Sequence, residues 1–462
     1  MKITTLSVLT AIALSATSAS ALTLYTDPAT GQVFTTAGDG RVEMGDFVDA
    51  KTVYEENQAQ DSAAMKKEVS AKGNKISIMR DDSPEFLLGK ETDINMKFVP
   101  GDNPDMWFKA GVRIQGTFEN VDSAQDGSQS DAYLRRTRFE AQAGFGKHAS
   151  FVMDIRNDKV NLDQKGEQTF NVGDAYVKIK KPFDTSLVNF KLYRAKIDVS
   201  RTETVKSARV IAYDRPKVAD YAAQYITHNR RGTNAQMYGD WEKKVHYQIA
   251  AGDATYQGSL DDAKGKSVTE GGAEIDKQSF FYGGKVVLSP FDGWEETQRT
   301  ETYMGEGKHF EIGAGYWAVN SIKVVDDTTG ATRGDLKNEL INLEMSAHYK
   351  GLFVQAEYFK MQDVAATFNA PTLTTGTSTG WYATSEYVIP ELAYLAPFVR
   401  YEKWDKFDDL DGYDYEAKIA GVNWYLRGNT TKVGLYVQKE KEGANIGDDD
   451  ITTVRLTSQW FF

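Results

Sequence analysis

Basic side chains recur two residues apart in several extended segments of the first half of the chain. A period of two places alternate side chains on one face of a strand, and the basic residues that share the predicted inner face are Lys109, Arg113, Arg136, Arg138, Arg156, Lys178, Lys180 and Lys191. Acidic residues on that face lie mostly in the second half: Glu119, Glu140, Asp154, Glu311, Glu344, Glu357, Glu386 and Glu402. Arg suits oxyanions because its planar guanidinium donates two hydrogen bonds at once. The pattern predicts a cationic wall that guides anions, with a transverse field toward an acidic wall.

The residues that usually carry catalysis or bind metals are too scattered to form a site. The five His residues lie far apart and lack the spacing of metal ligands: His148, His228, His246, His309 and His348. Ser346 and His348 share one face, but any water-filled lumen requires such polar side chains. Asp408, Asp409, Asp411 and Asp414 lack the spacing of a Ca²⁺-binding EF-hand loop and fit a solvated external loop. The chain has no Cys, which excludes a Cys-ligated metal. Since nothing singles out a catalytic group either, we expect no enzymatic activity, no cofactor and no metal site.

The segments that must position the charges read as strands of about ten residues, the length of a tilted transmembrane strand. Sixteen are predicted, at 106–119, 132–144, 149–157, 172–181, 188–197, 233–242, 245–256, 278–290, 309–320, 339–350, 352–362, 380–390, 394–404, 413–426, 432–441 and 450–462. Short turns such as Lys350-Gly351 alternate with long polar connections such as 363–379. Outer-membrane barrels show this alternation, with short periplasmic turns and longer external loops. One connection departs from it, because Pro290 to Lys308 is long where a short turn is expected.

The last strand indicates whether the outer face of the predicted sheet contacts lipid or water. Leu456 and Trp460 share one face and Arg455 shares the other with Gln459, and the chain stops on Phe462. A terminal aromatic residue on an amphipathic strand resembles the assembly signal of outer-membrane barrels. The aromatic content of 12% and the mean hydropathy of -0.49 fit aromatic girdles and a polar lumen, although composition alone leaves a soluble β-sandwich or propeller open. The predicted fold is all-β: a transmembrane antiparallel β-barrel of sixteen strands with long external loops and an N-terminal periplasmic extension.

The beginning of the chain predicts secretion. Lys2, the apolar run from Leu6 to Leu14 and the small residues ending at Ala21 predict a cleaved signal peptide over residues 1–21. Residues 22–103 are predicted to be a periplasmic extension with a short helix within 49–71, either a partial plug or a trimeric stalk. Residues 104–462 are the predicted barrel pore. The net charge of -12 argues against nucleic acid as a partner, and we expect the barrel to contact outer-membrane lipid and lipopolysaccharide.

Several pieces of the barrel region resemble the phosphate/pyrophosphate-selective porins, the porin O and P family. They are 134–139 (Leu-Arg-Arg-Thr-Arg-Phe), 174–177 (Asp-Ala-Tyr-Val), 350–358 (Lys-Gly-Leu-Phe-Val-Gln-Ala-Glu-Tyr), 421–426 (Gly-Val-Asn-Trp-Tyr-Leu) and 459–462 (Gln-Trp-Phe-Phe). No single piece is specific for the family, but the order and spacing of the pieces together are. The resemblance, which covers about 104 to 462, implies a sixteen-stranded homotrimer with one pore in each subunit and no enzymatic activity.

The family's constriction loop follows the fifth strand, which here is the connection from Asp198 to Gly232. The resemblance implies that its polar residues line the narrow part of the pore: Arg201, Lys206, Ser207, Arg209, Arg215 and Lys217. This loop departs from the family pattern, because Ala208 replaces a second Ser and Ile197-Asp198 replaces Pro-Phe. Those departures weigh against phosphate selectivity but not against a porin.

Two hypotheses follow for the function. The first is an outer-membrane porin for passive diffusion of small hydrophilic solutes, preferring anions, with phosphate-like oxyanions among the candidates. The second is a structural or surface-interaction barrel whose lumen is closed. The sequence does not rank phosphate, sulfate, nitrate and organic acids as solutes.

Overall fold

The chain divides into two compact units, residues 1–69 with 82–84 and residues 70–81 with 85–462. The computed structural model describes residues 22–26, 33–34, 42–47, 75–79, 95–99, 105–160, 170–227, 230–254, 266–269, 273–291, 300–305, 307–367, 374–444, 447 and 449–461. In the first unit, β1 (Leu22–Thr26) pairs antiparallel with β2 (Val33–Phe34) and β3 (Val42–Phe47). The predicted signal peptide and the predicted helix within 49–71 lie outside the described residues.

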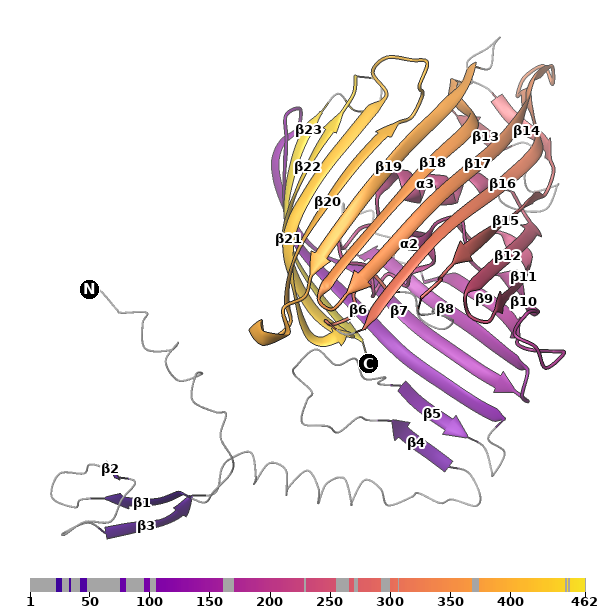
Figure 1. The fold of residues 1–462 in the computed structure, drawn as a ribbon. Helices are drawn as coiled ribbons and strands as arrows, with labels where there is room; N and C mark the ends of the chain where they lie inside the picture. Colours follow the sequence, from indigo (N-terminus) through magenta and orange to yellow (C-terminus); the bar gives the residue numbers. More distant parts are fainter. Residues whose placement is uncertain are drawn as a thin grey trace. The chain divides into compact units, whose positions relative to one another are not determined.

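The second unit is a closed antiparallel barrel of sixteen strands (Figure 1). Its strands are β6 (Met106–Ser123), β7 (Gly127–Phe145), β8 (Ala149–Val160), β9 (Asn171–Ile179), β10 (Asn189–Arg194), β11 (Thr233–Trp241), β12 (Val245–Gly252), β15 (Phe281–Leu288), β16 (Lys308–Asp326), β17 (Thr332–Tyr349), β18 (Leu352–Thr367), β19 (Thr374–Tyr387), β20 (Leu395–Asp405), β21 (Asp414–Asn429), β22 (Thr431–Glu442) and β23 (Asp450–Phe461). The last strand pairs with the first, from Ile451 opposite Ser123 to Phe461 opposite Arg113. Because the ring is closed, these strands have no free edge. Unpaired backbone N–H and C=O groups at such an edge would cost free energy in the hydrocarbon core of a bilayer. The predicted sixteen-stranded barrel is confirmed.

Short additional elements extend this framework. β4 (Lys75–Met79) and β5 (Asn95–Val99) form a hairpin that pairs with β6, and β13 (Lys266–Thr269) with β14 (Ala273–Gln278) forms one that pairs with β16. The connection between β10 and β11 contains α2 (Arg201–Thr204) and α3 (Lys217–Ile226), and η3 (Pro390–Leu392) lies between β19 and β20. No helix in the described ranges has the length and apolar content needed to cross a bilayer.

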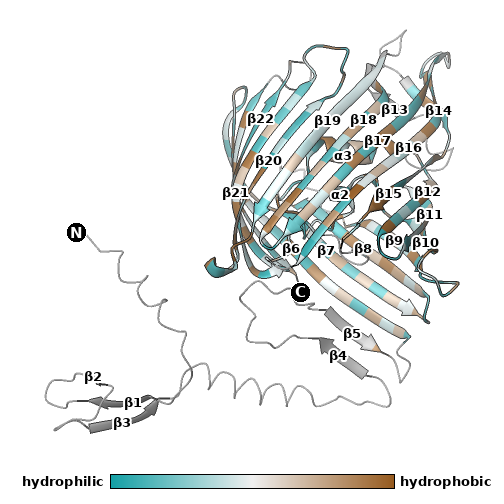
Figure 2. Ribbon diagram, in the orientation of Figure 1, coloured by the Kyte–Doolittle hydropathy of each residue, from teal (hydrophilic) through white to brown (hydrophobic). Residues whose placement is uncertain are grey.

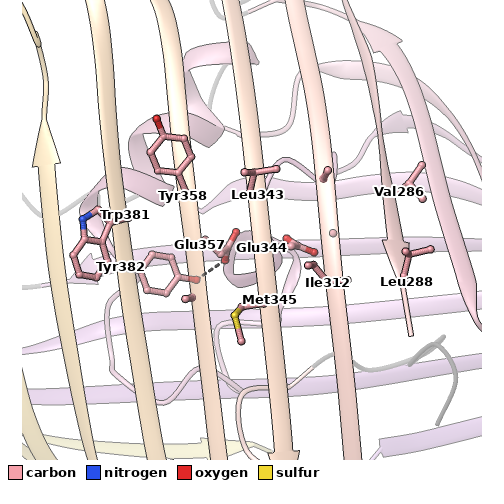
Figure 3. Close-up of a pocket in the computed structure, with 13 residues that line it drawn as sticks. Val286, Leu288, Ile312, Leu343, Glu344, Met345, Glu357, Tyr358, Trp381 and Tyr382 are labelled. Carbon is pink, nitrogen blue, oxygen red and sulfur yellow. Dashed lines mark hydrogen bonds between the residues drawn. The ribbon is translucent and has the colours of Figure 1, made fainter. Parts of the chain in front are cut away.

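Polar and apolar residues alternate along the strands, as Figure 2 shows. On the second half of β17, Leu343, Met345 and Tyr349 are exposed, whereas the alternate residues Glu344, Ser346 and His348 are buried. Figure 3 shows the pattern around an apolar groove of about 660 Å³ over β15 to β19, where Leu343, Met345 and Trp381 line the exposed side while Glu357 and Tyr382 hydrogen bond to each other. An apolar outer face with a polar inner face is what a barrel in lipid requires.

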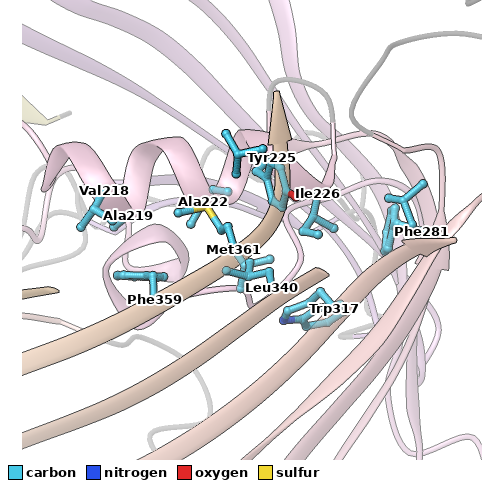
Figure 4. Packing of buried hydrophobic residues seen from close by; sticks show 14 of the residues in the cluster. Val218, Ala219, Ala222, Tyr225, Ile226, Phe281, Trp317, Leu340, Phe359 and Met361 are labelled. Atoms are coloured by element: carbon cyan, nitrogen blue, oxygen red, sulfur yellow. The ribbon is translucent and has the colours of Figure 1, made fainter. Parts of the chain in front are cut away.

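One side of the lumen contains a buried apolar cluster, which is uncommon for a surface meant to face water. The apolar face of α3 packs onto the inner faces of β16 to β20, where Val218 and Ala222 lie near Leu340, Phe359 and Met361 (Figure 4). This packing fixes the connection between β10 and β11 inside the barrel.

Candidate functional site

The connection between β10 and β11, residues 195–232, contains the loop predicted to narrow the pore, and we name this connection the constriction loop; the structure describes it except for 228–229. It contacts inner-face residues of strands all around the ring: Gln115 on β6, Arg135 on β7, Gln248 on β12, Glu311 on β16, Glu357 on β18, Arg400 on β20, Asn423 on β21, Lys432 on β22 and Gln459 on β23. A segment that reaches so many strands of a closed ring lies inside it. The predicted loop thus narrows the lumen.

Arg201 anchors the loop to the second half of the barrel. Its side chain is fully buried, with Nε 2.6 Å from Oε1 of Glu311 and Nη1 donating to Gln355 at 2.8 Å. The backbone N–H groups of Arg201 and Thr202 donate to the two oxygens of Glu357, at 3.0 and 2.9 Å. Arg201 was predicted to face passing anions, but its charge is neutralised inside the wall. Its function here is to hold the loop.

The other inner acids of the second half also hold protein groups. Glu344 pairs with the buried Lys285, whose Nζ lies 2.8 Å from Oδ1 of Asp198 in the loop. Glu402 accepts the backbone N–H of Lys217 at 2.8 Å. The predicted transverse field assumed that these carboxylates face water. Their carboxylates instead bind the loop and its supports, so they contribute little free charge to the lumen.

The long connection from 290 to 308 also reaches the constriction loop. Within it, the carboxylate of Glu301 accepts hydrogen bonds from Oγ1 of Thr202 at 2.7 Å and from the backbone N–H of Ile211 at 2.8 Å. The backbone oxygen of Thr300 accepts from Arg201 at 2.9 Å. A two-residue turn could not extend this far from the rim of the barrel. The need to brace the loop accounts for a length that the strand pattern did not explain.

The inner faces of β6 to β9, which we name the basic wall, carry the predicted arginines. Arg113, Arg138 and Arg156 lie in register on three neighbouring strands. Arg113 pairs with Glu140 at 3.0 Å and Arg138 with Asp158 at 3.1 Å. Part of the basic wall is therefore neutralised by carboxylates on the same strands.

The predicted lysines on the inner face gather nearer the short-turn end. Nζ of Lys178 and of Lys191 lies 5.7 and 5.1 Å from the ring centre of Tyr238, and Lys109 lies 5.6 Å from that of Trp107. Lys180 follows Lys178 by two residues, immediately after β9. These lysines meet aromatic faces, which favour cations, and they extend the basic wall toward the periplasmic turns.

A β-bulge brings in a basic residue that the alternation did not predict. Arg136 lies opposite Gln115 and Leu134 opposite Gly116, so Arg135 has no partner in the ladder. The extra residue of a bulge turns a side chain out of strict alternation, and Arg135 joins Arg136 on the inner side. The charge of Arg135 was the one feature of the sequence that indicated this break in the alternation. Strict alternation would place Arg135 in lipid, at a cost of about 2–4 kcal/mol near the midplane of the bilayer.

Three arginines converge on one loop carboxylate, that of Asp214. Arg135 Nη2 lies 2.8 Å, Arg455 Nη1 3.1 Å and Arg136 Nη2 3.7 Å from its oxygens. Burial alone would raise the pKa of Asp214, but Arg135, Arg455 and Arg136 hold that pKa below its ordinary value. Arg455 was assigned to the inner face of the last strand but not to the site, and only the loop geometry shows that it belongs here.

The other predicted loop residues have different surroundings. Lys206 is exposed and pairs with Glu140 at 3.1 Å, and Lys217 pairs with Glu442 at 2.5 Å. Arg215 is buried and donates to the backbone oxygens of Thr202 and Val205, at 2.7 and 2.6 Å. It therefore braces the loop internally. Arg209 is half-buried and Ser207 is buried.

The loop, β7 and β8, and the inner faces of β20 to β23 line a polar cavity of about 350 Å³. Eight of its lining residues are basic and four are acidic, an excess of four positive charges. The basic ones are Arg135, Arg136, Lys159, Arg215, Lys217, Arg230, Arg400 and Arg455, and the acidic ones Asp214, Asp220, Glu402 and Glu440. The whole chain has a net charge of -12. The cavity is thus a local cationic site in an acidic protein. No group of three or more His, Asp or Glu side chains in the described part of the chain is placed to hold a metal ion.

Comparison with known proteins gives the family and the fold. Residues 108–460 match the family model described as phosphate-selective porin O and P, whereas no curated protein sequence matches the chain. Similar solved structures include the anion-selective porin from Comamonas acidovorans (10% identity, TM-score 0.53, 77% of this chain and 99% of that one). Others are the outer membrane channel DcaP of Acinetobacter baumannii (10%, 0.53, 81% and 100%) and OprB of Pseudomonas putida (12%, 0.51, 77% and 94%).

Each line of comparison supports a different conclusion. At identities this low, the solved structures show the shared barrel fold alone. The family model, in contrast, covers most of the chain, including all sixteen barrel strands apart from the ends of the first and last. The chain therefore belongs to the phosphate-selective porin O and P family and is a porin of the outer membrane.

Proposed function

We propose that this porin passes small hydrophilic solutes by passive diffusion and prefers anions because of the charge of its narrow cavity. The supporting observation is the excess of four positive charges around about 350 Å³ of polar space, beside the constriction loop. A charged constriction raises the local concentration of counter-ions and lowers that of ions of like charge. The acidic residues of the lining, Glu402 among them, are already counted in this excess.

Planar-bilayer recording of the purified protein in a KCl gradient tests the proposal. We expect discrete openings and a reversal potential displaced toward the chloride equilibrium potential. A reversal potential at zero or toward potassium contradicts anion preference. A folded protein that stays silent contradicts the pore and favours a closed structural barrel, in which the loop and the α3 cluster seal the lumen.

We propose small oxyanions as the preferred class, with phosphate among them. The cavity is rich in guanidinium groups, which pair with two oxygens of one anion. Ala208 in place of a second family Ser removes one hydroxyl donor from the loop, so we expect phosphate to bind weakly. Phosphate added during chloride conduction should reduce the current at millimolar concentration, and an unchanged current would indicate a general anion pore.

We also propose that the porin assembles as a homotrimer through the outer faces of β6 to β9. Tyr and Trp mark surfaces that meet lipid headgroups, and the exposed side chains Tyr316, Tyr358, Trp381 and Trp424 lie on β16 to β21. Among the large hydrophobic side chains exposed on β6 to β9 there are Phe, Met, Leu and Val but neither Tyr nor Trp in the residues described. Cross-linking of intact outer membranes should give a three-subunit species that Phe139→Lys abolishes. A monomer in the wild-type membrane would contradict the trimer.

The N-terminal organisation is part of the same proposal. Residues 1–21 are a cleaved signal peptide, residues 22–103 a periplasmic extension, and residues 104–462 the pore. Mass spectrometry of protein extracted from outer membranes should show a mature chain that begins at Leu22. Retention of residues 1–21 would contradict this processing.

A further inference from the structure

The carboxylate of Asp214 has more cationic partners than a structural contact needs. Arg135 and Arg455 lie 2.8 and 3.1 Å from its oxygens and Arg136 lies 3.7 Å away. Among the residues that the structure describes, the one other carboxylate in an ion pair with these three guanidinium groups is Glu119, which pairs with Arg455. The cluster therefore keeps a positive charge even with Asp214 in place.

The loop does not depend on this carboxylate for its position. Its backbone oxygens near Asp214 accept hydrogen bonds from strand side chains: Ile211 from Asn423 at 3.1 Å, Tyr213 from Arg136 at 3.1 Å and Asp214 from Arg400 at 2.7 Å. These bonds hold the backbone on both sides of the side chain. The carboxylate is thus free to leave the arginines without release of the loop.

The carboxylate is also within reach of a passing solute. The side chain of Asp214 is 31% exposed and, like all three arginines, lines the polar cavity. Its two oxygens contact the arginines as those of a small oxyanion would. A solute carboxylate or phosphate in the cavity meets the same donors.

We propose that Asp214 is a tethered anion that occupies the arginine site, so that a permeating oxyanion must exchange with it. This inference rests on the proposed anion preference and names the residue that sets affinity. Exchange keeps binding weak, because the departing anion is replaced at once by a carboxylate already held nearby. A bare arginine site would bind oxyanions more tightly and release them more slowly.

The test compares Asp214→Asn with Glu440→Gln in bilayer recordings of chloride current, with phosphate and acetate as separate blockers. Both variants remove one negative charge from the lining of the cavity, but only Asp214→Asn removes the tethered anion. For Asp214→Asn we expect half-block by each anion at a concentration on the order of tenfold lower, the change that one ion pair of about 1.4 kcal/mol produces. Asp214→Glu keeps a tethered carboxylate, so it should need a higher concentration of each anion for half-block than Asp214→Asn.

The outcomes separate this inference from the proposed function. Equal block of Asp214→Asn and Glu440→Gln would overturn the tethered anion and leave only a general effect of charge. The proposed anion preference is judged by the wild-type reversal potential alone, whatever the variants do. If phosphate blocks more tightly and acetate does not, the site is selective for phosphate. If Asp214→Asn fails to migrate as a folded barrel on unheated gels, Asp214→Ser makes the same test with a smaller side chain.

Discussion

The basic wall on β6 to β9 and the inner faces of β15 to β20 both consist of charged side chains on the inner side of strands, but their partners differ. On the basic wall, Arg113 pairs with an acid on the same wall while Arg135 and Arg136 face the cavity. On β15 to β20, Lys285 and its neighbouring acids bind the constriction loop. From this comparison we expect an inward charge in the barrel to contribute to conduction only where no other segment covers it.

Substitution of Arg201 should give the largest effect, because it removes the main anchor of the loop. Arg201→Ala leaves Glu311 buried without its cationic partner at 2.6 Å, and breaking a buried pair costs roughly 3–5 kcal/mol. We expect the loop to detach, which would increase single-channel conductance and current noise. The exposed loop residue Lys206 provides the control, since Lys206→Ala removes a loop charge without releasing the loop and should not increase current noise. Equal conductance in wild type and Arg201→Ala would show that the loop is held elsewhere.

Substitutions at Arg135 and Arg136 should give the next largest effect, on selectivity rather than on the loop. If both face the cavity, Arg135→Gln and Arg136→Gln should each shift the reversal potential toward zero by a similar amount. Strict alternation would leave Arg135 in lipid and its substitution without effect on ions. A shift for Arg136→Gln alone would therefore disprove the bulge, and Lys418→Gln, on an exposed side chain, serves as the control for charge.

Glu301→Gln should have a smaller effect, since it weakens a brace and leaves the Arg201 anchor intact. An amide at position 301 loses one acceptor for Thr202 or Ile211, and a hydrogen bond to a charged group is worth about 1.5–3 kcal/mol. We expect more frequent brief closures or increases in current, with unchanged ion selectivity. If the openings of Glu301→Gln are as quiet as those of the wild type, the connection from 290 to 308 fills space without supporting the loop.

These differences mark how much of the molecule the sequence could predict. A period of two identifies all sixteen strands, because each strand contacts lipid on one side whatever its neighbours do. The same period places Arg201 in a connection and Glu311 on an inner face, but their contact joins residues 110 positions apart. Nor could it identify Arg135, because a bulge is set by the register between two strands. The strands follow from local pattern, whereas the site depends on where one long loop packs.

The smallest effect we expect is on pH dependence, and it concerns Glu203 within the loop. Burial tends to raise the pKa of Glu203, but Arg230, Arg215 and Lys196 lower that pKa to about 2. A lowered carboxyl pKa stabilises the folded loop above the ordinary value of about 4.3, by on the order of 3 kcal/mol, and this contribution is lost as pH falls toward 2. Wild-type current noise should therefore stay constant from pH 7 to pH 5 and rise below about pH 4. In Glu203→Gln the noise should be higher than in the wild type at pH 7 and should change less with acid. If the two proteins respond to acid identically, a group other than Glu203 controls the acid sensitivity of the loop.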